Sequence, residues 1–184
     1  MSIRTRLTHR AALAPLGLSL AVLLSGTGGC SYSDTGGNGA SAKSGTSSGA
    51  TPIAASDPWT AVQLVKPADL AAQLADTSGE KPVLLHVGFK VLYKAGAIPG
   101  TRYLGPGSRE DGIASLRAAV NDLPRDRAIV LYCGCCPWGD CPNMRPAFKA
   151  VSELGFTNVR ALYITKNLDT DWVGEGYPVE KPGD

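Results

Sequence analysis

The stretch from Arg127 to Asn143 reads RAIVLYCGCCPWGDCPN, and it joins a continuous apolar run to four of the chain's five cysteines. The run that ends at Tyr132 has the composition of a strand covered on both faces, as strands of parallel sheets are. Pro146 cannot lie deeper than the fourth position of a helix without the loss of a hydrogen bond, so the next helix begins at about Asn143 or later. Residues 133–142 are therefore predicted to form a loop between the carboxyl end of a buried strand and a helix N-terminus, where parallel α/β sheets bind ligands.

The rest of the folded part alternates between strand and helix patterns. Three other segments are predicted strands: 61–65, 82–87 and 158–164. Helical patterns lie at 66–74, 112–122 and 143–154. Gly155 suits the position just after the last of these helices. This alternation predicts an α/β domain with a mostly parallel sheet.

The chain before this domain divides into two parts. Basic residues precede an apolar run from Ala11 to Leu24, which at about 21 Å is too short for a comfortable membrane span and is typical of an export signal. Small residues then lead to Cys30 in the order GTGGC, which resembles the lipobox of bacterial lipoproteins, whose cysteine is acylated. We therefore expect a signal peptide at 1–29, lipidation of Cys30, a flexible tether rich in Gly, Ser, Thr and Ala at 30–57, and the folded domain at 58–184.

This organisation predicts a protein of the bacterial cell envelope that contacts the membrane through its lipid alone, on the outer membrane or facing the periplasm. Without lipidation, the expectation is a periplasmic or secreted protein. Cleavage removes three of the 18 Lys and Arg residues and none of the 16 Asp and Glu residues, which leaves the chain close to neutral. Because no basic tract remains, we expect no binding to nucleic acid. We expect one core and a monomer.

The order of short motifs resembles that of the single-domain rhodaneses, a family of sulfurtransferases. VKPADL at 65–70, YKAGAIPGT at 93–101 and LYC at 131–133 are similar to the family's opening motif, its second motif and the strand end that carries its catalytic cysteine. LGFTNV at 154–159, and Trp172 with GYPV at 176–179, are similar to its last two motifs. The resemblance implies the family's fold, a three-layer α/β/α domain with a mostly parallel central sheet.

The chain departs from the family pattern around the site. His86 and Gly88 stand where active members usually carry an Asp and an Arg. The loop after Cys133 is longer than the family's loop, and the extra residues contain the other three cysteines. Because His86 lies within an apolar strand, we expect a packed, hydrogen-bonded imidazole and not a catalytic base.

The resemblance implies that a cysteine accepts sulfane sulfur as a persulfide, from a small donor such as thiosulfate or another persulfide, and passes it to a thiol or to cyanide. Cys133 is the implied carrier, because loop N–H groups and a helix N-terminus favour an anion there. Cys136, at a C-x-x-C spacing, is the simplest thiol to resolve the persulfide as a disulfide. Gly134, Trp138 and Arg145 are candidate substrate-binding residues, and Arg145 suits an anionic donor. No metal or cofactor is expected under this interpretation.

Three other interpretations of the cysteines remain open. Cys135 and Cys141 are candidates for a redox or structural disulfide in an oxidising envelope, which makes thiol exchange the alternative activity. Four thiolates can hold Zn²⁺ or another soft metal, although the adjacent Cys135 and Cys136 make a tetrahedron awkward. The cysteines can also pin a long loop of a non-catalytic, rhodanese-like binding domain. A phosphatase of the same fold is disfavoured, because no arginine lies six positions after any of these cysteines.

Overall fold

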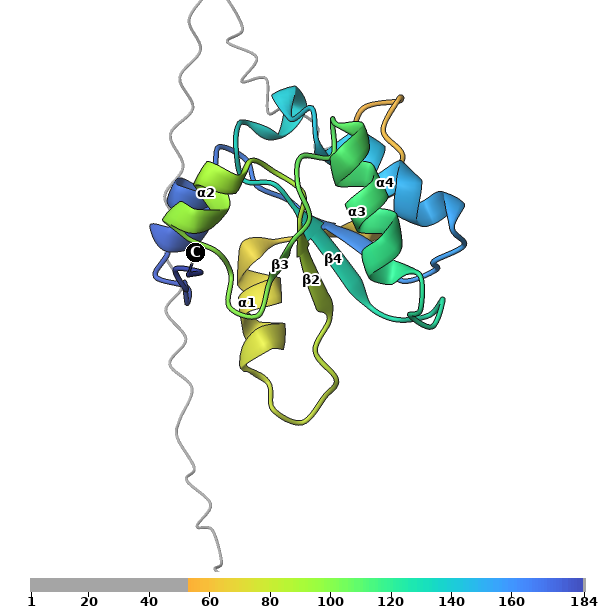
Figure 1. Cartoon of the computed structure of the whole chain (residues 1–184). Helices are drawn as coiled ribbons and strands as arrows, with labels where there is room; N and C mark the ends of the chain where they lie inside the picture. The colour runs from red at the N-terminus through yellow and green to blue at the C-terminus, as the bar shows by residue number, and fades with distance from the viewer. Residues whose placement is uncertain (1–52, 184) are drawn as a thin grey trace, which may run out of the picture. The chain divides into compact units, whose positions relative to one another are not determined.

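The computed structural model describes residues 53–183, and its elements alternate between strand and helix as the sequence predicts (Figure 1). A five-stranded sheet has the order β1-β5-β4-β2-β3, and all of its strand pairs are parallel. Its strands are β1 (Leu64–Val65), β2 (Val83–His86), β3 (Arg102–Tyr103), β4 (Ile129–Tyr132) and β5 (Val159–Leu162). The predicted α/β fold with a parallel central sheet is confirmed.

Helices cover both faces of the sheet and complete three layers. The α-helices of the described residues are α1 (Pro67–Ala75), α2 (Lys90–Ala95), α3 (Glu110–Val120) and α4 (Met144–Glu153). Three shorter helical segments are η1 (Ala61–Gln63), η2 (Trp138–Asp140) and the π-helical turn η3 (Asp169–Val173). Helices α3 and α4 lie side by side over one face, whereas α1 and η3 pack on the other (Figure 1).

Alternate side chains of β4 point into opposite layers of the core. Ile129, Leu131 and then Cys133 belong to the apolar cluster under α3 and α4. Val130 and Tyr132 belong to the cluster under α1. All five side chains are buried, so the continuous apolar run of the sequence is that of a strand covered on both faces. This alternation places the side chain of Cys133 on the α4 side of the sheet.

The predicted helix starts agree with the structure where proline fixes them. Helix α4 begins at Met144, so Pro146 is its third residue, where no intrahelical hydrogen bond is lost. The predicted strand at 61–65 is wrong over its first half. Residues 61–63 form η1, because the side chain of Gln63 accepts the backbone N–H of Thr60 at 2.9 Å and caps a short helical turn.

The start of the described chain already contacts the domain. Trp59 is buried, and the partly buried Ile53 packs on the same apolar cluster. The predicted signal peptide, the lipidation site Cys30 and most of the predicted tether lie outside the described residues. Within residues 53–183, no helix is both long enough and apolar enough to cross a membrane.

Candidate functional site

Four thiols gather at the carboxyl end of β4. Cys133 directly follows the strand, its side chain is 2% exposed, and its Sγ lies 3.0 Å from the Sγ of Cys135. The sulfur of Cys136 lies 3.0 Å from that of Cys135. The sulfurs of Cys133, Cys135 and Cys141 all lie within 4.8 Å of one another. The four cysteines, which we call the thiol cluster, are not joined by disulfides.

Gly134 makes the turn that brings two of these sulfurs together. Its φ of 70° lies in the left-handed region, which favours glycine. A Cβ at this position would lie 2.7 Å from the Cβ of Leu168, and the carbonyl of Gly134 accepts the N–H of Leu168 at 3.2 Å. A side chain at position 134 would therefore both strain the turn and displace the segment that packs over it.

The rest of the loop is anchored against the sheet. The N–H of Trp138 donates to the carbonyl of Thr165 at 3.3 Å. The indole ring lies 5.0 Å from the ring of Trp59 and 5.2 Å from that of Tyr163, measured between centroids. Trp138 thus holds η2 against the core. The chain after η2 returns to the carboxyl end of β4, where the side chain of Cys141 is 5% exposed.

Asn143, which immediately precedes α4, links the thiol cluster to the segment before α3. Its side chain is completely buried, and its Oδ1 accepts the N–H of Ser108 at 3.1 Å and the hydroxyl of Ser108 at 2.8 Å. A backbone N–H can only donate, so this contact fixes which end of the amide faces Ser108. The Nδ2 group therefore points to the sulfurs and donates to Cys133 at 3.2 Å and, at 3.9 Å, to Cys135. A donor aimed at two sulfurs favours their anionic form.

Two glycines leave room for this arrangement. A Cβ on Gly88 would lie 2.9 Å from the Sγ of Cys133 and 3.0 Å from its carbonyl oxygen. A Cβ on Gly107 would collide with the carbonyl oxygen of Asn143. Position 88 is where the motif order leads one to expect an arginine, and here any side chain would meet the sulfur of Cys133.

His86 is the packed imidazole that the sequence predicts. Its Nδ1 accepts the N–H of Gly88 at 3.3 Å, and its ring also hydrogen-bonds the backbone of Cys133. The ring lies 5.0 Å from that of Tyr132. Burial lowers the pKa of His86 to about 4, so the imidazole is neutral near pH 7 and supports the strand end without carrying charge.

The thiols of the cluster differ in how readily each loses its proton. The hydrogen bond that Cys133 donates to Cys135 is the largest of the causes that raise the pKa of Cys133, and burial adds to it. Hydrogen bonds from Cys133 and Cys141 lower the pKa of Cys135. Burial raises the pKa of Cys136. Cys135, which is half-buried, is therefore the group on which the first negative charge of the cluster settles.

A cavity of about 280 Å³ opens beside this pair of thiols. Cys133, Gly134 and Cys135 form one side of it, and the other walls come from α2 and from residues 167–173. Asp169 is a lining residue, whereas no lysine or arginine is among the residues that line the cavity. A small molecule in this space would reach the sulfur of Cys135 without passing a cationic side chain.

Two of the predicted substrate-binding residues lie away from this cavity. Trp138 packs in the core as described, and Arg145 faces the start of the domain. The Nε of Arg145 lies 2.7 Å from the carboxylate of Asp57, whose side chain is 1% exposed. Its Nη1 donates to the carbonyls of Gly139 and Cys141 at 3.3 and 3.4 Å. Arg145 thus ties the cysteine loop to the segment before the first strand.

Sequence reasoning missed Asn143 as a site residue and Asp57 as the partner of Arg145. Asn143 was recognised only as a helix boundary, which followed from the position of Pro146. Its contact with Ser108 spans 35 positions of the chain, and the contact between Asp57 and Arg145 spans 88. No local pattern marks either contact.

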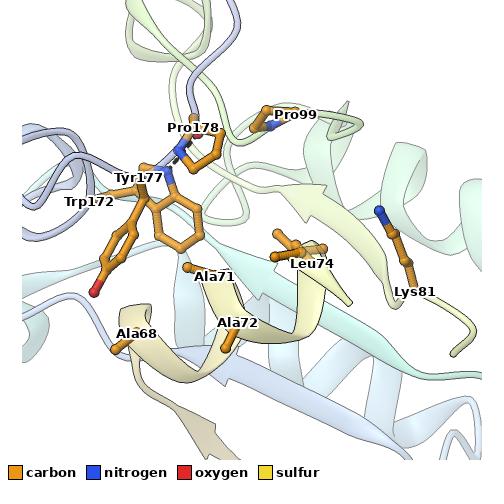
Figure 2. A pocket seen from close by; sticks show the side chains of 10 residues that line it. Ala68, Ala71, Ala72, Leu74, Lys81, Pro99, Trp172, Tyr177 and Pro178 are labelled. Carbon is orange, nitrogen blue, oxygen red and sulfur yellow. Dashed lines mark hydrogen bonds between the residues drawn. The ribbon is translucent and has the colours of Figure 1, made fainter. Parts of the chain in front are cut away.

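A second cavity, of about 510 Å³, lies along α1 on the other side of the sheet (Figure 2). Small side chains of α1 form its floor, Trp172 and Tyr177 form a wall, and Lys81 lies at one end. Trp172 is completely buried, and its Nε1–H donates to the carbonyl of Pro178 at 2.9 Å. None of its lining residues is a cysteine or an acid.

Comparison with known proteins gives similarity at the level of solved structures. No family model and no curated protein matches the chain. A crystal structure of the Alr3790 protein from Anabaena sp. is 21% identical over 64% of this chain and 82% of its own, with a TM-score of 0.49. The solution structure of the rhodanese-like domain of Alr3790 is 19% identical over 65% and 80%, with a TM-score of 0.48. A rhodanese-like domain protein from Staphylococcus aureus is 15% identical over 64% and 98%, with a TM-score of 0.38. The solved structures to which this chain is similar thus include rhodanese-like domains, the family that its motif order resembles.

Proposed function

We propose that the chain is a sulfurtransferase that carries sulfane sulfur as a persulfide on a cysteine of the thiol cluster. The observation that carries the proposal is the pair formed by Cys133 and Cys135. Their sulfurs lie 3.0 Å apart at the end of β4, border a cavity and face the amide donor of Asn143. Such a pair supplies a thiolate, a donor that favours its charge and room for a small reactant.

Cys135 is the thiol that we propose for the first step. Its thiolate attacks the outer sulfur of the donor, so that a bond forms between the two sulfurs while the bond from the donor to that sulfur breaks. The donor leaves with the electron pair, as sulfite from thiosulfate or as a thiolate from an organic persulfide. The negative charge then lies on the terminal sulfur of the new persulfide.

The second step returns Cys135 to its starting state. A thiolate or cyanide attacks the terminal sulfur, takes it, and leaves the electron pair of the broken bond on Cys135. The motif order assigns the carrier role to Cys133, but its burial and the hydrogen bond that it donates support it as the partner that holds the charge of Cys135.

Sulfur loading followed by intact-mass measurement tests this proposal. The reduced chain, incubated with thiosulfate and separately with an organic persulfide, is expected to gain the mass of one sulfur atom and to lose it when cyanide is added. Cys135→Ser is expected to abolish loading, whereas Cys136→Ser, which removes the neighbouring thiol outside the pair, is expected to retain it. Loading by Cys135→Ser but not by Cys133→Ser would move the carrier role to Cys133. Loading that survives both substitutions would overturn the proposal.

Thiol–disulfide exchange is a second candidate activity that one observation favours. The distance of 3.0 Å between the sulfurs of Cys133 and Cys135 is about 1 Å longer than a disulfide bond of about 2.05 Å, so a small movement would join them. Mass measurement after alkylation, with and without prior reduction, separates the activities. A redox protein isolated under air carries a reversible disulfide in the cluster, whereas a sulfur carrier retains an alkylatable thiol or a persulfide.

We also propose that the protein works in the bacterial cell envelope as a monomer, with Cys30 as its lipid anchor and a small thiol as its sulfur acceptor. The basic and apolar start of the chain and the GTGGC stretch before the tether support this placement. Membrane fractionation and intact mass of the protein from its native cells test it. Cys30→Ser is expected to release the protein from the membrane fraction.

A further inference from the structure

We propose that the thiol cluster also binds a single Cu(I) ion through the sulfurs of Cys133, Cys135 and Cys141. This site goes beyond the proposed sulfur transfer and does not rest on it. It rests on the distances, the burial and the number of the sulfur ligands, each of which restricts the ion that fits.

The distances place the three sulfurs close to the geometry of one bound ion. They lie within 4.8 Å of one another. Two thiolates that bind one ion at about 2.3 Å each, as in zinc sites, can lie at most about 4.6 Å apart. The mutual distances of the three sulfurs are therefore within a few tenths of an ångström of the span that one bound ion allows.

The number of ligands favours copper over zinc. Within residues 53–183, no fourth His, Cys, Asp or Glu shares the mutual distances of the three. Cys136 is 3.0 Å from Cys135 but stands outside this set, and the Nδ1 of His86 accepts the N–H of Gly88. Structural zinc sites are almost always tetrahedral with four protein ligands, and zinc sites with three protein ligands keep a water in the fourth position. Here the burial of Cys133 and Cys141 limits the access of water to such a position. Soft thiolates select Cu(I) as well as zinc, and Cu(I) differs in that two or three sulfur ligands alone complete its coordination.

The surroundings suit a buried cuprous ion. Cys133 and Cys141 lie within the apolar cluster under α4, which limits contact between the ion and water. The amide of Asn143, held in place by Ser108, donates to Cys133 and offsets part of the charge of the thiolates. The cavity beside Cys133 and Cys135 provides an entry path. Each thiol that binds loses its proton to solvent, and copper enters and stays as Cu(I), so no electron is transferred.

Copper and sulfane sulfur cannot occupy this site together. Both need the sulfur of Cys135, which is bonded to the outer sulfur in the persulfide and to the ion in the copper site. We therefore expect copper binding to block sulfur loading, and sulfur loading to weaken copper binding. Cys141 is a copper ligand but not the sulfur carrier, so Cys141→Ser is expected to lose copper and still to load sulfur, although more slowly because its hydrogen bond to Cys135 is changed.

Competition for Cu(I) under anaerobic, reducing conditions tests the inference. The full-length chain is titrated with Cu(I) in the presence of bathocuproine disulfonate, a chelator whose cuprous complex is coloured. We expect one equivalent to be withheld from the chelator. The X-ray absorption spectrum of the bound copper is expected to show sulfur as its sole first-shell scatterer.

Substitutions identify the ligands. Cys135→Ser and Cys141→Ser are each expected to weaken Cu(I) binding by more than the roughly 10- to 100-fold that loss of an outer-shell partner causes. Cys136→Ser is the matched control, because it removes an adjacent thiol that lies outside the triad, and it is expected to retain the ion. Circular dichroism of each variant establishes that it is folded.

Three results would overturn the inference: no copper withheld from the chelator, equal retention by Cys141→Ser and wild type, or four-coordinate zinc bound in preference with Cys136 as a ligand. The copper experiment and the sulfur-loading experiment can fail separately. A chain that withholds copper but never loads sulfur contradicts the sulfurtransferase proposal alone. A chain that loads sulfur but loses all of its copper to the chelator contradicts the copper inference alone.

Discussion

The side-chain amide of Asn143 donates a hydrogen bond to the sulfur of Cys133 over 3.2 Å, and both side chains are buried. The same amide is held from its other end by Ser108. The amide therefore acts as a fixed donor to the thiol cluster, and its orientation is set by a residue that touches no sulfur. A fixed donor needs no reorganisation when negative charge develops on the sulfurs.

Asn143→Asp is expected to slow sulfur loading and to raise the pH at which the cluster reacts. A carboxylate can still accept from Ser108 but places a negative charge where the amide donated to sulfur. Loss of a hydrogen bond to a charged group costs about 1.5–3 kcal/mol, which corresponds to roughly 10- to 150-fold in rate. The pH dependence of alkylation by iodoacetamide, followed by intact mass, measures the change directly.

Ser108→Ala is the matched control for this substitution. It removes one of the two hydrogen bonds to the Oδ1 of Asn143 but keeps the backbone N–H that orients the amide. A small change in the alkylation profile is therefore expected. An unchanged profile for Asn143→Asp would show that the amide does not stabilise the thiolate.

Gly88→Ala is expected to disturb the cluster and to destabilise the domain. The new Cβ would lie 2.9 Å from the sulfur of Cys133 and 2.9 Å from the Cε1 of His86, closer than such atoms pack, so one of them must shift. Overpacking of this kind typically costs about 1–3 kcal/mol of the free energy of unfolding. Urea denaturation measures this cost, and the rate of sulfur loading reports the displacement of Cys133.

Gly79→Ala provides the comparison, since a Cβ there would meet nothing within 4 Å. It is expected to unfold at the same urea concentration as wild type or at a slightly higher one, because alanine restricts the unfolded chain more than glycine does. Equal stability of the two variants would contradict the close approach of Gly88 to Cys133.

The strands that the sequence predicts correctly are those buried on both faces. The segments at 82–87, 127–132 and 158–164 contain β2, β4 and β5, because coverage from two layers requires continuous apolar runs. By contrast, β3 and α2 were not predicted as elements. A strand of two residues and a helix of six carry too short a pattern, and β3 exists because it pairs with β2.

Only those parts of the site that depend on neighbouring residues in the sequence could be predicted. The strand end and Pro146 placed Cys133 in a loop before a helix, and the structure has that loop. The partners of Asn143 and Arg145 lie far away in the chain, so the amide was missed and the guanidinium was assigned to a substrate. The unequal protonation of the thiols also depends on burial and on contacts across the loop, which spacing alone does not give.

The buried His86 is expected to make stability depend on pH. Burial lowers its pKa to about 4 in the folded chain from 6.5, so the unfolded chain binds a proton at a higher pH than the folded chain does. The stability that the neutral imidazole contributes is therefore complete above about pH 6.5 and is lost as the pH falls towards 4. The free energy of unfolding, measured in urea at several pH values, is expected to decline over this range.

Carboxyl groups that titrate below pH 5 also make the free energy of unfolding depend on pH. A comparison with His86→Gln therefore isolates the contribution of the histidine. This variant is expected to be less stable at pH 7, because it loses the ring's packing. Its stability is also expected to change less between pH 6.5 and 5 than that of wild type. Parallel curves for the two proteins would contradict a neutral, buried imidazole.

Arg145→Ala distinguishes two roles for this arginine: an ion pair that stabilises the fold, and a binding site for an anionic sulfur donor. The guanidinium holds the almost fully buried carboxylate of Asp57 at 2.7 Å and lies away from the cavity beside the thiols. Its loss is therefore expected to cost about 1.5–3 kcal/mol of the free energy of unfolding, the usual value of a hydrogen bond to a charged group. The KM for thiosulfate is expected to change little.

A double-mutant cycle with Asp57→Asn completes the test. If the ion pair is the main contribution of Arg145, the double variant is less destabilised than the sum of the two single variants, because neither charge is then left without its partner. Urea denaturation of the four proteins gives the coupling energy, and steady-state kinetics with thiosulfate gives the KM of each. A KM that rises strongly in Arg145→Ala, with stability unchanged, would instead assign the arginine to an anionic donor. The cavity, whose lining includes Asp169 and no lysine or arginine, argues against that outcome.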